Sequence, residues 1–151
     1  MSSRAEFPDV TDWRLIDELQ QDGRLSFNEL GRRVSLSAPA VAERVRRLEE
    51  HGVITGYHAH VDPAKVGHSV AALVRMNCYG PNCLLRHPHV VEQNPAILEV
   101  HRLTGDSCCV LRVAVRSMAE FEELIDRLAE HGTPSSTMVL SSPVPWRPVG
   151  R

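Results

Sequence analysis

The first third of the chain spaces its hydrophobic residues as an α-helix does. Leu15 and Leu19 lie one helical turn apart, and they predict a first helix over residues 11–21. Asp9 or Thr11 can accept a hydrogen bond from a free backbone N–H at its start, as N-capping residues do. A short amphipathic helix is therefore expected to open the fold.

A second helix is predicted between Ser26 and residues 35–37. Ser26 is a favourable N-cap, and Glu29 stands three residues later, which is the pattern of a capping box. Leu30 and Val34 then fall on one face of this helix. Residues 35–37 interrupt the pattern and predict a tight turn.

The third helix begins after that turn and is rich in arginine. Ser37 can cap it, Pro39 suits its first turn, and Gly52 follows its end. The buried stripe of this helix is Val41, Val45 and Leu48. Its arginines are Arg44, Arg46 and Arg47. Two helices joined by so short a turn, the second of them basic, are typical of a helix-turn-helix that binds DNA.

Charge is distributed unevenly in a chain whose net charge is only −2. Between Arg24 and Leu48, six arginines stand against two glutamates, which gives this segment a local charge of +4. A positive face of this kind attracts phosphates, whereas the acidic remainder limits indiscriminate binding. Double-stranded DNA is therefore the partner that the charge pattern favours.

After residue 61 the pattern changes to alternating strands and helices. Strands are predicted over residues 70–79, 97–103, 109–115 and 135–140, and helices over residues 82–93, which Pro88 interrupts, and 118–131. The order β-α-β-β-α-β predicts an α+β, ferredoxin-like domain. We expect a helix-turn-helix domain over residues 1–61, with a strand or wing over residues 54–61, a linker over residues 62–69, and the ferredoxin-like domain over residues 70–151.

Two segments resemble the Lrp/AsnC family, the leucine-responsive or feast/famine transcriptional regulators of bacteria and archaea. Residues 41–49 (VAERVRRLE) and 52–57 (GVITGY) are similar to the signature of the family's winged helix-turn-helix. Residues 99–106 (EVHRLTGD) are similar to its domain for the regulation of amino-acid metabolism. The resemblance spans about residues 9–140, and it implies a sequence-specific regulator of transcription and not an enzyme.

The face of the third helix opposite its buried stripe is expected to meet DNA. The N-terminal part of a recognition helix faces the base edges, and arginines around it suit phosphates and guanine. The candidate DNA-binding residues are Arg24, Arg32, Arg33, Ser37, Ala38, Ala40, Glu43, Arg44, Arg46 and Arg47.

The resemblance also implies a free amino acid as effector, and no other cofactor is expected. It places this ligand beside the turn after the second strand, where a glycine exposes backbone N–H groups and Asp106 can pair with an α-ammonium. The candidate effector-binding residues are Leu103, Thr104, Gly105, Asp106, Ser107, Cys108 and Ser136. The family usually carries an aromatic residue and an aspartate where this chain has Ser107 and Cys108. An ordinary Gly-Asp hairpin turn is the alternative.

The ferredoxin-like sheet is expected to pair two chains. The strands over residues 70–76 and 109–115 are apolar on both faces, so the sheet face without helices needs cover. A homodimer packed sheet to sheet provides that cover, and it suits palindromic DNA half-sites. The resemblance implies that such dimers assemble further, often to octamers.

The four cysteines allow another interpretation. Reduced and mostly buried thiols are expected in a chain without a secretion signal, with the adjacent Cys108 and Cys109 on opposite faces of a strand. A zinc site would make the chain a metal- or thiol-sensing regulator instead. Its ligands would be Cys78, Cys83, His87 and His89.

Two other classes of function are less favoured. An enzyme with a cysteine nucleophile is disfavoured, because no third orienting group is evident. A general DNA-organising protein would differ from a regulator only in its selectivity.

Membrane and export signals are not evident in the sequence. The longest purely apolar run, residues 70–74, is far shorter than the ~20 residues that span a bilayer. The N-terminus lacks the apolar core of a signal peptide. A cytoplasmic protein with no membrane partner is expected.

Overall fold

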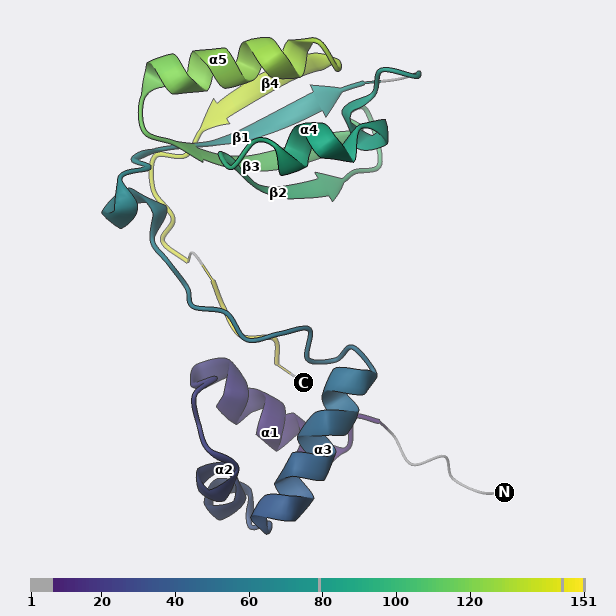
Figure 1. Cartoon of the computed structure of the whole chain (residues 1–151), viewed down its shortest axis with the longest axis vertical. Helices are drawn as coiled ribbons and strands as arrows, with labels where there is room; N and C mark the ends of the chain where they lie inside the picture. The colour runs from purple at the N-terminus through teal and green to yellow at the C-terminus, as the bar shows by residue number, and fades with distance from the viewer. Residues whose placement is uncertain (1–6, 79, 145, 151) are drawn as a thin grey trace. The chain divides into compact units, whose positions relative to one another are not determined.

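The computed structural model describes residues 7–78, 80–144 and 146–150. The chain forms two compact units, Met1–His60 together with Val144–Arg151, and Val61–Pro143 (Figure 1). In the described ranges, no helix has both the length and the apolar character needed to cross a bilayer.

The first unit contains α1 (Val10–Gln21), α2 (Phe27–Val34) and α3 (Ala38–Glu50). Ser26 and Ser37 cap α2 and α3 as predicted, and each side chain accepts a hydrogen bond from the backbone N–H three residues on. The three helices bury one shared core, made of Leu15, Leu30, Val34, Val41 and Val45. The stripe predicted for the third helix is therefore the side of α3 that faces α1 and α2.

The capping box lies on α1 and not on α2, where the sequence predicted it. Asp12 N donates to Asp9 Oδ1 at 2.8 Å, and Asp9 N donates to Asp12 Oδ2 at 3.0 Å. On α2, the Glu29 carboxylate binds Arg32 and Arg33 instead of reaching back to the cap. Arginines one turn further along the helix attract this carboxylate away from the helix start.

An ion pair joins the start of α1 to the middle of α3. Arg44 Nη1 donates to Asp12 Oδ1 at 2.6 Å and to Asp9 Oδ2 at 2.8 Å. Asp12 is only 2% exposed, so its carboxylate has lost most of its water. The hydrogen bonds that Arg44 donates to Asp9 and Asp12 raise the pKa of Arg44. Burial opposes ionisation of Asp9, but the bonds it receives from Arg44 and from backbone N–H groups lower its pKa overall.

One expectation about the segments after α3 is wrong. Residues 54–62 form no strand, because no second segment offers these residues a ladder of backbone hydrogen bonds in the described chain. Val144–Arg151 group with the first unit, and the extent of the ferredoxin-like domain over residues 70–151 stays a prediction. The Gln20 amide holds this C-terminal segment there by donating to Val149 O at 2.9 Å and accepting from Val149 N at 2.8 Å. The limits of a linker over residues 62–69 stay a prediction.

The second unit confirms the predicted β-α-β-β-α-β order. Its strands are β1 (Val70–Asn77), β2 (Ile97–Arg102), β3 (Cys109–Val115) and β4 (Thr133–Met138). They form one antiparallel sheet in the order β2-β3-β1-β4. The other elements are η1 (Pro63–Val66), η2 (Leu84–Arg86), α4 (Pro88–Glu92) and α5 (Met118–Ala129). Pro88 opens α4 rather than interrupting a longer helix, because proline fits only the first turn.

One face of the sheet packs against α5 and the η2–α4 segment (Figure 1). Alternate residues of β1 and β3 point into this core, among them Val74, Met76 and Leu111, all fully buried. The opposite face is mixed rather than apolar, since Leu73 is exposed between arginines at positions 75 and 112.

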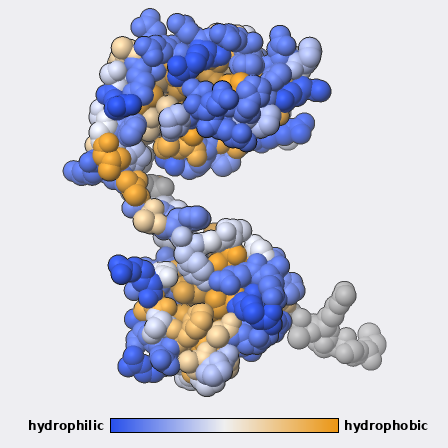
Figure 2. Space-filling model, viewed as in Figure 1, coloured by the Kyte–Doolittle hydropathy of each residue, from blue (hydrophilic) through white to orange (hydrophobic). Residues whose placement is uncertain are grey.

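Hydrophobic side chains are also exposed around η1, as Figure 2 shows on the face drawn there. Val61 is 62% exposed and Val66 is 59% exposed. Each lies outside the core of the second unit. The segment that leads into β1 therefore presents apolar surface to water.

We predict that Arg44→Met destabilises the first unit by about 3 kcal/mol, because it leaves the Asp12 carboxylate buried without a counter-charge. Both tryptophans of the chain, Trp13 and Trp146, lie in this unit, so tryptophan fluorescence during denaturant unfolding reports on it.

The matched control is Arg46→Met. Arg46 pairs with Glu43 and Glu50, and all three side chains are more than half exposed. This variant is expected to lose less than about 1 kcal/mol. Equal losses in the two variants would contradict a structural role for the Arg44 ion pair.

Candidate functional site

The turn between α2 and α3 is held by close backbone contacts. Leu36 N donates to Gly31 O at 2.9 Å, and Ser35 adopts a left-handed conformation with φ 61°. A Cβ atom on Gly31 would lie 2.4 Å from Leu36 O, so any side chain there requires the Leu36 carbonyl to move. Glycine is therefore required in α2 for the chain to turn so tightly into α3.

The outer face of α3 carries the residues predicted to read bases. Ser37 and Glu43 are exposed, and Ala38 and Ala40 are partly exposed. Small side chains at the helix start leave room for a close approach of another molecule. The hydrogen bond from Arg46 keeps the pKa of Glu43 below its ordinary value, so this carboxylate is a permanent acceptor near neutral pH.

The predicted arginines differ in what they bind. Arg33 pairs with Glu18 at 2.6 Å and Glu29 at 3.2 Å, and Arg32 and Arg46 also pair with exposed glutamates. Arg44 is occupied by its two aspartates. Among the described residues, no ion pair engages Arg24 or Arg47, both of which are exposed.

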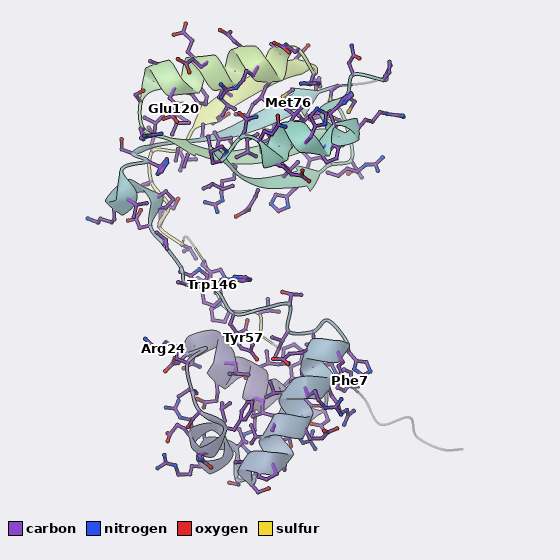
Figure 3. The ribbon with its side chains drawn as sticks, in the orientation of Figure 1. Phe7, Arg24, Tyr57, Met76, Glu120 and Trp146 are labelled. Atoms are coloured by element: carbon purple, nitrogen blue, oxygen red, sulfur yellow. A yellow bond between two sulfur atoms is a disulfide. The ribbon has the colours of Figure 1, made fainter. Side chains whose placement is uncertain are left out.

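Arg47 is stacked instead of paired. Its guanidinium carbon lies 5.1 Å from the centre of the Phe7 ring, which lies beside α3 in Figure 3. The Phe7 ring in turn contacts His51, with ring centres 4.7 Å apart. Stacking of this kind restrains the arginine and leaves its charge uncompensated.

A cavity of about 450 Å³ adjoins the turn between β2 and β3 in the second unit. Four of the predicted effector residues line it: Leu103, Gly105, Ser107 and Cys108. Thr104, Asp106 and Ser136 are not part of its wall. Ser136 lies on β4, opposite Val74 of β1. β1 separates β4 from β3, so Ser136 is two strands away from the β2–β3 turn.

The cavity wall also contains residues that the sequence did not suggest. Arg86 follows Leu85 in η2, and Arg102 ends β2, so two guanidinium groups contribute positive charge to one cavity. Such a wall suits a carboxylate or another small anion. The one available signal was the position of Arg102 immediately before the turn that the resemblance singled out.

Cys78 and Cys83 contribute to the same wall, and the structure corrects two expectations about the cysteines. Cys78 and Cys108 form a disulfide, with Cα atoms 6.0 Å apart, so the four thiols are not all free. Cys108 precedes β3 at a bend rather than lying within the strand. Its sulfur therefore lies 3.7 Å from that of Cys109 instead of on the opposite face.

The predicted zinc ligands do not converge. Cys78 and Cys83 have their sulfur atoms 2.9 Å apart, but His87 Nε2 is bonded to Pro81 O at 2.9 Å. Within the described ranges, the one group of potential metal ligands consists of Cys78, Cys83 and Cys108. The candidate ligand set in the structure therefore contains Cys108 and neither of the two predicted histidines.

Each of the two units matches a known protein domain. Residues 9–49 match the AsnC-type helix-turn-helix domain, and residues 84–149 match the Lrp/AsnC ligand binding domain. The uncharacterized HTH-type transcriptional regulator YezC of Bacillus subtilis is 40% identical, over 89% of this chain and 94% of that protein. The chain belongs to the Lrp/AsnC family.

Solved structures of this family resemble this chain over most of its length. That of Bacillus subtilis LrpC has a TM-score of 0.85 at 31% identity, covering 91% of this chain and 98% of that one. The feast or famine regulatory protein of Mycobacterium tuberculosis, complexed with L-methionine, has a TM-score of 0.83 at 34% identity and covers 90% and 94%. The Lrp/AsnC relatives are transcriptional regulators and not enzymes, and this chain is a regulator of their type.

We predict that Gly31→Ala in this Lrp/AsnC protein costs about 1–3 kcal/mol of stability, because the new methyl group must push the Leu36 carbonyl away. The same displacement tilts α3 against α2, so affinity for DNA should also fall. Tryptophan fluorescence on unfolding and a DNA-binding titration measure the two effects.

Gly23→Ala is the matched control, since a Cβ atom there meets only ordinary contacts, the nearest at 3.5 Å from Tyr57. It should leave both stability and affinity close to those of the wild type. If Gly31→Ala had the same stability and DNA affinity as Gly23→Ala, the close Gly31–Leu36 contact would not be what holds the turn.

Proposed function

We propose that this Lrp/AsnC regulator binds specific DNA sites as a homodimer, inserts α3 into the major groove, and responds to a free amino acid. The observation that carries the proposal is the α2–turn–α3 unit, in which Gly31 and the Ser37 cap fix a basic helix whose outer residues Ser37, Glu43, Arg46 and Arg47 are exposed. A protein that acts on chromosomal DNA works in the cytoplasm of a bacterium or archaeon.

The residues of this surface fall into three roles. Ser37, Ala38, Ala40 and Glu43 read base edges, because the start of a recognition helix faces the floor of the groove. The phosphate contacts come from Arg24, Arg32, Arg33, Arg46 and Arg47. Arg44 is left out of both sets, since its charge is neutralised by Asp9 and Asp12, and its role is to hold α3 in place.

The homodimer is supported by the apolar surface that one chain leaves exposed. Leu73 lies on the sheet face without helices, and Val61 and Val66 precede the sheet. Leu140, just after β4, is 96% exposed. Pairing two chains covers such groups and presents two recognition helices to a palindromic site. The resemblance to the family extends this to assembly of dimers into octamers.

The amino-acid effector is supported by the cavity beside the β2–β3 turn. Its wall contains Arg86 and Arg102, whose guanidinium groups suit an α-carboxylate. Asp106 lies on the same turn but outside the wall of the single chain, and we propose that its carboxylate pairs with the α-ammonium when the ligand binds. A relative of the same fold has been solved with L-methionine. We propose that Leu103, Thr104, Gly105, Asp106, Ser107, Cys108 and Ser136 contribute to this site together with the two arginines.

We predict that Arg47→Ala weakens DNA binding and lowers the slope of log K against log salt by ~1, because one uncompensated phosphate contact is lost. A fluorescence-anisotropy titration over several salt concentrations measures both quantities. Arg116→Ala is the control, since Arg116 is an exposed arginine of the other unit that pairs with Glu120 at 3.6 Å. A wild-type slope near zero would rule out phosphate binding by this surface.

We predict that calorimetry with each of the twenty amino acids gives a saturable signal for at least one, and that Asp106→Ala abolishes it by removing the partner of the ammonium group. L-Methionine is the first to test. Asp126→Ala, which removes an exposed carboxylate from α5, should leave the signal intact. If none of the twenty amino acids gave a calorimetric signal, the proposed amino-acid effector would be contradicted, whereas the proposal of DNA binding would not be affected.

A further inference from the structure

The cysteines of the second unit gather into one cluster, although they come from distant parts of the chain. Cys78 follows β1, Cys83 precedes η2, and Cys108 precedes β3. The sulfur atoms of these three residues all lie within 4.8 Å of one another. Since their sequence separation reaches 30 residues, the fold and not a local motif brings them together.

We propose that, in the reduced protein, Cys78, Cys83 and Cys108 bind one thiophilic divalent metal ion of the zinc type at the wall of the effector cavity. Zinc–sulfur bonds of ~2.3 Å at tetrahedral angles put sulfur atoms about 3.8 Å apart. The sulfur atoms of Cys78 and Cys83 lie 2.9 Å apart, those of Cys78 and Cys108 are directly bonded until reduction separates them, and all three lie within 4.8 Å of one another. Side-chain adjustments of about an ångström therefore suffice.

The backbone around the cluster is held in place. Gly132 packs directly against Cys78, where an added Cβ atom would lie 2.5 Å from Cys78 Cβ and 2.8 Å from Asn77 O. Cys108 N donates to Met76 O at 2.8 Å, which ties the end of the β2–β3 turn to β1. Two of the three ligands are thus positioned by the sheet itself, as a metal site of low flexibility requires.

Two arginines near the cluster favour the negative charge that a metal site with three thiolates carries. Three thiolates around a divalent ion have a net charge of −1, and Arg86 and Arg102 line the same cavity as the three sulfur atoms. A fourth ligand position can open toward that cavity, as in zinc sites with three protein ligands. The cluster therefore offers one exchangeable position to water or to a small ligand.

Cys109 is a neighbour of the site and not a ligand. Its sulfur contacts Cys108 but lies outside the group of three. It therefore provides a matched control within the same cluster.

Metal binding and the Cys78–Cys108 disulfide exclude each other. A dithiol reductant transfers two electrons and two protons to this disulfide, which breaks the S–S bond and gives two thiols while the reductant becomes a cyclic disulfide. A divalent ion then replaces the three thiol protons and forms three metal–sulfur bonds. Oxidation removes two of the three ligands, so the oxidised chain should not bind the ion.

The test uses the full chain, reduced with a dithiol, freed of reductant without oxygen, and titrated with Co²⁺ as a spectroscopic probe. We expect sulfur-to-cobalt charge-transfer absorption that saturates at one equivalent and disappears when Zn²⁺ is added. Cys83→Ser and Cys108→Ser should each weaken binding at least tenfold, whereas Cys109→Ser should bind like the wild type. Circular dichroism verifies that each variant is folded.

Two outcomes would overturn the proposal. One is a reduced wild type, with four titratable thiols, that gives no charge-transfer absorption. The other is a loss in Cys109→Ser as large as in Cys83→Ser, which would mean unspecific binding by thiols. Because the absorption is read without DNA or amino acid, neither outcome bears on the proposed regulatory function.

Discussion

The orientation of the recognition helix depends on a buried carboxylate. Asp12 accepts a hydrogen bond from the start of its own helix and binds Arg44 on α3, and it is almost completely removed from water. A carboxylate in that position is stable only with its counter-charge, so the first turn of α1 and the middle of α3 cannot separate. Val45 and its neighbours on the buried stripe set the rotation of α3 about its axis, and the ion pair sets its position along α1. The exposed arginines point outward as a consequence of both constraints.

Local signals in the sequence predicted the elements well, because they depend on neighbouring residues. The limits of β3 were predicted residue for residue, and Ser37 caps α3 as its position before Pro39 indicated. The interactions that complete the site were not predictable in this way. Arg44 looked like one of several basic residues, because its partner lies 32 positions away. The segment over residues 54–61 has the composition of a strand, but a strand forms only where a second segment supplies hydrogen bonds.

The cavity beside the β2–β3 turn was also predictable only in part, for a similar reason. The resemblance located the turn between β2 and β3, and Gly105 and Ser107 do line a cavity there. The remainder of its wall comes from η2, and no sequence pattern connects Arg86 with that turn. An antiparallel sheet with a crossover helix brings such segments together at one end. The two arginines and three cysteines of the cavity wall are therefore brought together by the topology of the fold, and no local sequence motif contains them all.

The same arrangement links the cysteine cluster to the cavity beside the β2–β3 turn. Leu103 N donates to Cys108 O, and Cys108 N donates to Met76 O, so this cysteine links the turn to the central strand. Its sulfur forms part of the cavity wall. Any change in what Cys108 binds must therefore act on the turn and on the shape of the cavity. When two ligands share one wall, the binding of each changes the affinity for the other by the same factor. In the two proposals made above, one structural element therefore carries both the response to an amino acid and the state of the cysteines.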